Sequence, residues 1–199
     1  MPKIVILTGG ISSGKTTVSS IFKSFNIKIV DTDIIASRLT GENGSALKKL
    51  KENFGSQFFK FDGSLDKKKM RIEIFSNYKE KLKIENILHP MIAQEVIKET
   101  ETAKSPYVIH VVPLWVEKNN NLKSSIWKLV VVDCCESIQR KRAMLRSKID
   151  ALTFNRIKST QVSRLTRLEV ADCVINNDGS LQTLRPQVSK IHNYLLNNV

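Results

Sequence analysis

The chain has 199 residues, of which 32 are Lys or Arg and 19 are Asp or Glu, so its formal net charge is +13. That length suffices for one α/β domain with a hydrophobic core and a small inserted subdomain, but it is short for two full domains. The positive charge favours polyanionic partners, which include nucleotides and nucleic acids. No apolar run approaches the roughly 20 residues of a membrane-spanning helix, and no signal-peptide region follows Met1. We therefore expect a cytoplasmic protein with no membrane partner.

The three cysteines do not indicate a disulfide framework or a zinc site. Cys134, Cys135 and Cys173 form no C-x-x-C pair, and no histidine lies near them in the sequence. We expect them to lie in or beside the hydrophobic core.

The first predicted element is a strand at Ile4 to Leu7, which a glycine-rich segment follows directly. Residues 9–16 read GGISSGKT and match the phosphate-loop pattern G-x-x-x-x-G-K-[ST] at every fixed position. In such a loop several backbone N–H groups point at one phosphate cluster, Lys15 adds a positive charge, and the Thr16 hydroxyl holds Mg²⁺. A helix predicted from Thr16 to Ser24 turns its positive dipole end to the same phosphates. This order of strand, glycine-rich loop and helix, with Lys15 and Thr16 at the fixed positions, predicts nucleotide binding. The alternative is a glycine-rich turn that binds no ligand.

Four further apolar runs rich in β-branched residues predict strands, and helical patterns separate them. Continuous apolar strands that alternate with helices are typical of a parallel sheet covered on both faces, with active-site loops at the carboxyl ends of the strands. We therefore predict an α/β fold, a three-layer αβα arrangement around a five-stranded parallel sheet, in one domain over residues 1–199. The four runs are Ile27 to Val30, Tyr107 to Val112, Leu129 to Val132 and Cys173 to Ile175.

Two carboxylates follow the second predicted strand, in the sequence Asp31-Thr32-Asp33. In an extended backbone residues two apart point to the same side, so both carboxylates can face the phosphate loop. We expect Asp31 to act on Mg²⁺, usually through water, and Asp33 to accept the proton of the attacking hydroxyl. The alternative is that one aspartate caps a helix beginning near Ile34.

Residues 40–103 predict an inserted helical subdomain between the second and third strands. Its helical patterns cover Ser45 to Phe54, Lys67 to Phe75 and Tyr78 to about Thr102. Pro90 lies inside the third pattern and cannot donate a helical hydrogen bond, so we expect a kink or break near His89-Pro90.

The third strand ends without an aspartate, and the chain has no N-K-x-D run for guanine recognition. Both absences weigh against a simple ATPase or GTPase. His110, inside this strand, is expected to be a packed side chain, because an alternating strand position commonly faces a helix.

A basic helix follows the fourth strand, and Arg142 and Arg146 lie one helical turn apart on it. Arginine suits the charge of a transferring phosphoryl group because its planar fork donates two hydrogen bonds at once. A solvated basic helix is the alternative. Arg164 and Arg167 continue the basic series. Residues 147–167 predict a mobile lid over phosphates, and the chain ends in a helix predicted from about Ser180 to Leu196.

Together these segments resemble the dephospho-coenzyme A kinase family, in the nucleoside-monophosphate-kinase-like group, over essentially the whole chain. The more specific matches are His89-Pro90, Pro113-Leu114, the group of Gln139 with Arg142 and Arg146, and the group of Ala171-Asp172 with Asn177 and Gly179. The matching residues are Leu7 to Ile11 with Ser13 to Lys15, Asp31 to Asp33, Arg71 with Ile74-Phe75, Leu88 to Pro90, Pro113-Leu114 with Glu117, Gln139 with Arg142 and Arg146, and Ala171-Asp172 with Asn177 and Gly179.

The resemblance implies transfer of the ATP γ-phosphoryl group to the ribose 3′-hydroxyl of dephospho-coenzyme A, with Mg²⁺, in the last step of coenzyme A synthesis. It also implies a core domain, a helical acceptor-binding domain and a lid. The implied ATP-phosphate ligands are Ser12, Ser13, Gly14, Lys15, Thr16 and Thr17. Of the remaining residues, Asp33 is implied as the base, Arg142 and Arg146 on the lid side, Asn177 and Gly179 near the adenine, and Thr8 and His89 facing the acceptor.

Three positions depart from the family pattern: Ser12 replaces a common third glycine, Thr32 a usual alanine, and Leu165 an often charged residue. Two other functions stay open beside the kinase of dephospho-coenzyme A. The first is a phosphate-loop kinase for another small hydroxyl or nucleotide acceptor. The second is a nucleic-acid-binding protein, although no helix-turn-helix or aromatic-basic sheet motif is present. We expect no nucleic-acid partner and a monomer or small homo-oligomer.

Overall fold

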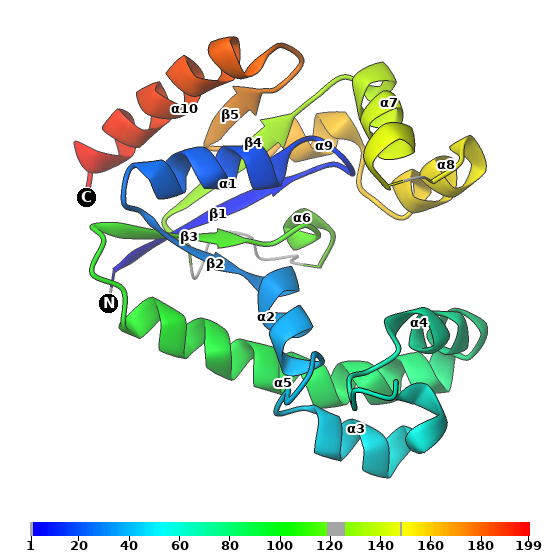
Figure 1. Cartoon of the computed structure of the whole chain (residues 1–199). Coiled ribbons are helices and arrows are strands. Elements are labelled where there is room, and N and C mark those ends of the chain that lie inside the picture. The colour runs from blue at the N-terminus through cyan, green and yellow to red at the C-terminus, as the bar shows by residue number, and fades with distance from the viewer. Residues whose placement is uncertain (1, 119–125, 148) are drawn as a thin grey trace. The chain divides into compact units, whose positions relative to one another are not determined.

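The computed structural model describes residues 2–118, 126–147 and 149–199 and contains a five-stranded sheet with the strand order β2-β3-β1-β4-β5 (Figure 1). β1 pairs in parallel with β3 and β4, and β4 pairs in parallel with β5. The predicted α/β class with a five-stranded parallel sheet is confirmed, and the five predicted strands agree with the observed ones to within two residues. The strands are β1 Lys3–Gly9, β2 Lys28–Asp31, β3 Tyr107–Val111, β4 Lys128–Asp133 and β5 Cys173–Asn176.

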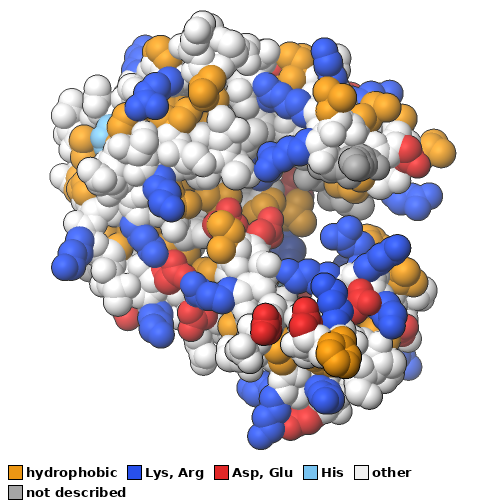
Figure 2. Space-filling view, viewed as in Figure 1, with side chains coloured by type: hydrophobic (Ala, Val, Ile, Leu, Met, Phe, Trp, Pro, Cys, Tyr) orange, Lys and Arg blue, Asp and Glu red, His pale blue; other side chains and the backbone are white. Residues whose placement is uncertain are grey.

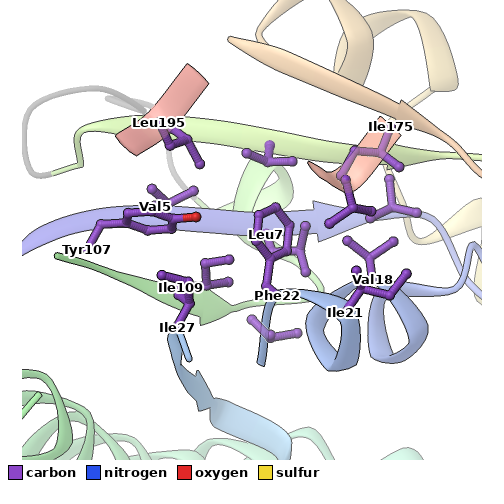
Figure 3. Close-up of a cluster of buried hydrophobic side chains, with 14 of the residues drawn as sticks. Val5, Leu7, Val18, Ile21, Phe22, Ile27, Tyr107, Ile109, Ile175 and Leu195 are labelled. Carbon is purple, nitrogen blue, oxygen red and sulfur yellow. The ribbon is translucent and has the colours of Figure 1, made fainter. Parts of the chain in front are cut away.

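The sheet is buried on both faces because its central strands carry apolar side chains at successive positions. Along β1, Val5 and Leu7 contribute to one core cluster and Ile6 to another, since alternate side chains point to opposite faces. Helices α1, Lys15–Ser24, and α10, Leu181–Leu196, pack on the first face, where Phe22 and Leu195 are fully buried (Figure 3). Helices α6, Trp115–Lys118, and α9, Arg164–Glu169, pack on the second face.

The chain divides into two compact units. The core unit comprises Met1–Val30 and Ala103–Val199, and the helical unit comprises Asp31–Thr102. The insertion predicted at residues 40–103 lies almost wholly within the helical unit. The phosphate loop and the region predicted as a lid both belong to the core unit.

The helical unit contains four α-helices and one 3₁₀ turn among its described residues, which include all of Asp31–Thr102. α5 continues through Pro90 as one helix, so of the two predicted alternatives, a kink or a break, the break does not occur. Proline removes one hydrogen-bond donor, but Asn77 caps the start of α5 through the N–H groups of Lys79 and Glu80. The elements are α2 Thr32–Leu39, α3 Leu47–Phe54, η1 Ser56–Phe58, α4 Lys67–Ser76 and α5 Tyr78–Glu101.

The remaining helices of the core unit are α7, Glu136–Ser147, and α8, Ala151–Ser159. The region predicted as a lid, residues 147–167, contains α8 and the first part of α9, and its residue 148 lies outside the described residues. The predicted final helix begins one residue later than expected, because Ser180 is its N-cap. Across the described parts of the chain, no helix has the length and apolar character needed to cross a membrane.

Candidate phosphate-binding and catalytic site

The phosphate loop connects the carboxyl end of β1 to the start of α1. Gly14 is the N-cap of α1 and has a left-handed backbone with φ of 98°. Ser12 also has a positive φ, of 54°. A residue with a Cβ adopts this conformation at a cost of about 1 kcal/mol. The loop therefore tolerates a side chain at Ser12, but in a backbone conformation that glycine adopts without strain.

The start of α1 has the features that favour an anion. No side chain caps this helix, and its first turn contains no acidic residue, so its first N–H groups have no side-chain partner from the cap. Thr16 and Thr17 are exposed there. The Lys15 ammonium donates to the carbonyl oxygens of Gly9 at 2.8 Å and Gly10 at 3.1 Å, which holds this positive charge over the loop. A helix N-terminus with an adjacent lysine fits a phosphate group.

Two side chains from distant elements hold the Ser13 carbonyl. The Asn177 amide, which is 5% exposed, donates to this oxygen at 2.7 Å, and the Arg142 guanidinium donates at 3.5 Å. Because a trans peptide points its C=O and N–H in opposite directions, the following N–H, that of Gly14, points away from these two side chains. Asn177 thus orients the loop in this structure, and its implied contact with adenine stays a prediction.

The four arginines of the basic series do not form one surface. Arg142 reaches the phosphate loop, and Arg146 is exposed one turn further along α7. Arg164 forms a two-pronged ion pair with Asp133, with its shortest N–O distance at 2.6 Å. Arg167 is buried beside Glu117, with an N–O distance of 3.5 Å. Arg142 and Arg146 are therefore the arginines of this series whose side chains are not held by an acidic partner within the described residues.

Asp133 was not among the residues singled out from the sequence, whereas Glu117 matched the family pattern without an assigned role. Asp133 is the last residue of β4 and is 7% exposed, at the edge of the sheet where the loops meet. Its position directly after four valine and leucine residues was an available signal, because active-site groups gather at the carboxyl ends of parallel strands. The pairing of Glu117 with Arg167 had no comparable signal, since the two residues lie far apart along the chain.

Asp31 is the N-cap of α2. Its Oδ1 accepts hydrogen bonds from the N–H groups of Asp33 at 2.9 Å and Ile34 at 3.2 Å, so the capping alternative is confirmed for Asp31. Asp33 is already helical, as the second residue of α2, and is exposed. The expectation that Asp31 and Asp33 point to the same side of an extended backbone is therefore wrong, because the cap turns the chain between them. The metal and base roles of these residues stay predictions.

The other predicted residues have varied surroundings. Thr8 is fully buried, and its hydroxyl donates to the Pro113 carbonyl at 3.2 Å, which joins β1 to the segment after β3. His89, in α5, and Gly179, after β5, are exposed. Thr8, His89 and Gly179 keep their implied substrate contacts as predictions. His110 is buried as expected, and burial lowers its pKa to about 4.

Cys134 is fully buried beside the phosphate site, as expected for a core cysteine. Burial, followed by a hydrogen bond with Asp178, raises the pKa of its thiol to about 12. The thiol therefore stays protonated at neutral pH and is unsuited to act as a nucleophile.

The oxygen donors of the predicted metal residues fit Mg²⁺. Among residues 2–118, 126–147 and 149–199, no three His, Cys, Asp or Glu side chains form a metal-binding group. Mg²⁺ needs no such cage, because it keeps several waters and usually takes one or two carboxylates with substrate phosphates. The exposed Thr16 hydroxyl at the start of α1 and the Asp31 carboxylate supply oxygen donors of the required kind.

A phosphate loop between the first strand of a parallel sheet and its helix, with arginines on the helix after β4, defines a P-loop nucleotide-binding protein. The family model for dephospho-CoA kinase matches residues 3–183. The chain belongs to the dephospho-CoA kinase family.

Individual relatives agree with this assignment. A dephospho-CoA kinase of Colwellia psychrerythraea is 41% identical over 181 residues, covering 90% of this chain and 89% of the relative. A dephospho-CoA kinase of Nitrosomonas europaea is 42% identical over 192 residues, covering 96% of this chain and 94% of the relative. The solved structure of dephospho-CoA kinase from Campylobacter jejuni superimposes with a TM-score of 0.65 at 25% identity, covering 97% of each chain.

Proposed function

We propose that this protein transfers the γ-phosphoryl group of ATP to the ribose 3′-hydroxyl of dephospho-coenzyme A, which gives coenzyme A and ADP. The observation that carries the proposal is the uncapped start of α1 with Lys15 beside it, in a chain of the dephospho-CoA kinase family. The reaction is the last step of coenzyme A synthesis, and we propose that it takes place in the cytoplasm.

In the transfer, a bond forms between the 3′-oxygen and the γ-phosphorus, and the bond from that phosphorus to the β–γ bridging oxygen breaks. The electron pair of the broken bond leaves with ADP, and the hydroxyl proton passes to Asp33. Such transfers depend on positioning and on stabilising charge rather than on covalent chemistry by the protein. Lys15, Arg142 and Arg146 supply positive charge to the phosphoryl oxygens.

The binding residues follow from the loop and the family. Residues 12–17 hold the phosphates of ATP through backbone N–H groups and hydroxyls. Asn177 and Gly179 lie by the adenine, and Thr8 and His89 contact the acceptor. We propose that, within the predicted lid of residues 147–167, α8 closes over the phosphates and excludes water.

We further propose that Mg²⁺ is held by the Thr16 hydroxyl and, through water, by the Asp31 carboxylate. Asp31 has one oxygen engaged in capping α2, so its second oxygen is the one assigned to this role. When bound, Mg²⁺ neutralises charge on the β- and γ-phosphates.

ADP release with and without dephospho-coenzyme A tests substrate and activity together. We expect ADP release to depend on dephospho-coenzyme A, and Lys15→Ala to lose nearly all turnover while its circular dichroism spectrum is unchanged. The matched control is Lys23→Ala, at the far end of the same helix, which should keep wild-type turnover.

Other outcomes would redirect the assignment. ADP release that depends on a different hydroxyl acceptor from a panel would favour the related-kinase alternative. Salt-dependent retention on DNA without acceptor-dependent ADP release would favour a nucleic-acid-binding protein. Full activity of Lys15→Ala would contradict the proposed role of the phosphate loop.

A further inference from the structure

The turn between α8 and α9 is fastened to the phosphate loop by a side chain from far along the sequence. The Gln161 carboxamide oxygen Oε1 accepts a hydrogen bond at 3.0 Å from the Ile11 N–H, 150 residues away. Ile11 lies in the first half of the loop, before the residues that cap α1. The proposed chemistry assigns no role to Gln161.

The next residue, Val162, is held at both of its backbone polar groups. Its N–H donates to Glu117 Oε1 at 3.2 Å, and its carbonyl accepts from Arg167 Nη2 at 3.0 Å. Glu117 and Arg167 also pair with each other at 3.5 Å, and their side chains are only 11% and 7% exposed. This buried pair fixes the backbone from which the Gln161 side chain extends.

We do not expect the buried Glu117–Arg167 ion pair to stabilise the fold. Within the described residues, Glu117 Oε2 and Arg167 Nε are buried and have no hydrogen-bond partner. Unsatisfied buried polar atoms cost stability, and a buried ion pair does not usually add to it. The Arg167 guanidinium also lies against the loop: a Cβ added to Gly10 would be 3.4 Å from its Nη1. The pair is better explained by what it positions than by what it contributes to folding.

The position of the Ile11 N–H determines where the Gly10 carbonyl points. The peptide between these residues is planar and trans, so its C=O points opposite to the N–H that Gln161 holds. The Gly10 carbonyl accepts hydrogen bonds from the Lys15 ammonium at 3.1 Å and from the Ser13 N–H at 3.2 Å. The Gly10–Ile11 peptide group therefore connects the Gln161 side chain to the position of the Lys15 ammonium.

We propose that Gln161 is a positioning residue that sets the Gly10–Ile11 peptide plane and thereby preorganises Lys15 and the loop for ATP. It acts through the loop and needs no contact with the nucleotide itself. This inference deepens the proposed function. It rests on that function in one respect only, which is that ATP is the ligand of the phosphate loop.

The experiment compares ATP affinity of the full chain and its variants, measured by calorimetric titration with ATP and magnesium in the absence of dephospho-coenzyme A. Gln161→Met keeps the side-chain length but has no strong acceptor. We expect its Kd for ATP to rise by about 3- to 10-fold, the effect of one lost hydrogen bond. Exchange of the Ile11 amide proton should become faster, and the KM for dephospho-coenzyme A should stay within about twofold.

The matched control is Lys158→Met in α8, which removes the exposed ion pair with Glu136 but leaves the Gln161 contact in place. Its ATP affinity should equal that of the wild type. Gln161→Ala, which cannot repack with a long side chain, should reproduce the weaker binding of Gln161→Met.

Unchanged ATP affinity in both Gln161 variants, or unchanged exchange of the Ile11 amide, overturns the proposal. Equal weakening by Lys158→Met also overturns it, because loosening of α8 would then account for the effect. If the wild type binds ATP but does not phosphorylate dephospho-coenzyme A, the proposed function fails, while the comparison of ATP affinities still decides the role of Gln161.

Discussion

At the residue scale, the orientation of two peptide groups gives the phosphate loop its binding geometry. Asn177 and Arg142 hold the Ser13 carbonyl, and Gln161 holds the Ile11 N–H. Each contact fixes a planar peptide group, in which the C=O and the N–H point in opposite directions. The loop sequence supplies these peptides, but side chains from elsewhere in the core unit orient them.

The role proposed for Asp33 predicts a specific kinetic defect. Asp33→Asn removes the proton acceptor, and we expect kcat to fall by about 10²- to 10⁴-fold, the usual contribution of a general base. The Kd for ATP should be preserved, because the variant keeps the loop unchanged. Steady-state kinetics and ATP titration measure the two quantities, and loss of ATP binding would instead assign Asp33 to a metal or structural role.

Asp31→Asn is the matched comparison, because asparagine caps a helix about as well as aspartate. A variant that keeps its thermal stability but needs more magnesium for half-maximal activity would support the proposed metal role of Asp31. Unchanged magnesium dependence would leave Asp31 with its cap alone.

Buried His110 predicts acid sensitivity. Burial lowers its pKa to about 4 in the folded state, against about 6.5 in the unfolded chain. The unfolded state therefore binds the proton more tightly, so the contribution of this group to stability is present above pH 6.5 and is lost as the pH falls toward 4. Between pH 7 and about pH 4.5 the loss should be roughly 2 to 3 kcal/mol.

Urea unfolding of the wild type and of His110→Gln at both pH values measures this term. The wild type should lose more unfolding free energy than the variant over the interval, whatever the carboxylates common to both contribute. Equal losses would show that His110 is not the group responsible.

At the element scale, the helices are defined mainly by their ends. Asn77 caps α5, and Asp66 and Asp31 cap α4 and α2 by the same use of a side-chain oxygen. In α5 the ion pairs of Arg38 with Glu95 and Glu99 connect its second half to α2 at 2.8 and 2.9 Å. The cap and these contacts lie on either side of Pro90, so the helix is supported on both sides of the residue that weakens it.

Pro90→Ala should therefore stabilise the helical unit. The substitution restores the N–H that can donate to the carbonyl of Asn86, four residues earlier, and removes the ring clash of an interior proline. We expect the free energy of unfolding to rise by about 1 to 3 kcal/mol, as measured by urea denaturation. A lower free energy of unfolding would show that Pro90 packs favourably in its place.

At the scale of the whole molecule, the formal net charge is +13. Lys and Arg side chains are scattered over the visible face, with Asp and Glu among them (Figure 2). Such a distribution attracts small anions over a long range but does not by itself define a nucleic-acid groove.

We accordingly expect ATP binding to weaken with salt. Raising NaCl from about 0.1 to 1 M shortens the screening length from about 10 to 3 Å, and the Kd for ATP should rise by roughly tenfold. Adenosine, which carries no charge, is the matched ligand and should bind with an affinity that changes by less than about twofold. A salt-independent Kd for ATP would show that the global charge contributes nothing to nucleotide binding.

The sequence alone determined the phosphate loop, the five strands and the resemblance that the family comparison confirmed. These features are local. A glycine-rich turn, an apolar strand or an amphipathic helix can be recognised from a short run of consecutive residues, because those residues determine its backbone conformation. Local pattern was insufficient at Asp31 and Asp33, because the capping bond that ends the strand was one of two open alternatives, and at Pro90, because the support on either side of it lies outside its own turn.

Only the tertiary structure decided which distant side chains meet at the loop. Gln161 with Ile11, Asp133 with Arg164 and Glu117 with Arg167 are brought together by the sheet and by α9. Such pairs leave no periodic signal in one sequence, because their spacing depends on how the intervening elements pack. The loop sequence therefore predicted the nucleotide, whereas the packing around it decided which residues hold the loop in position.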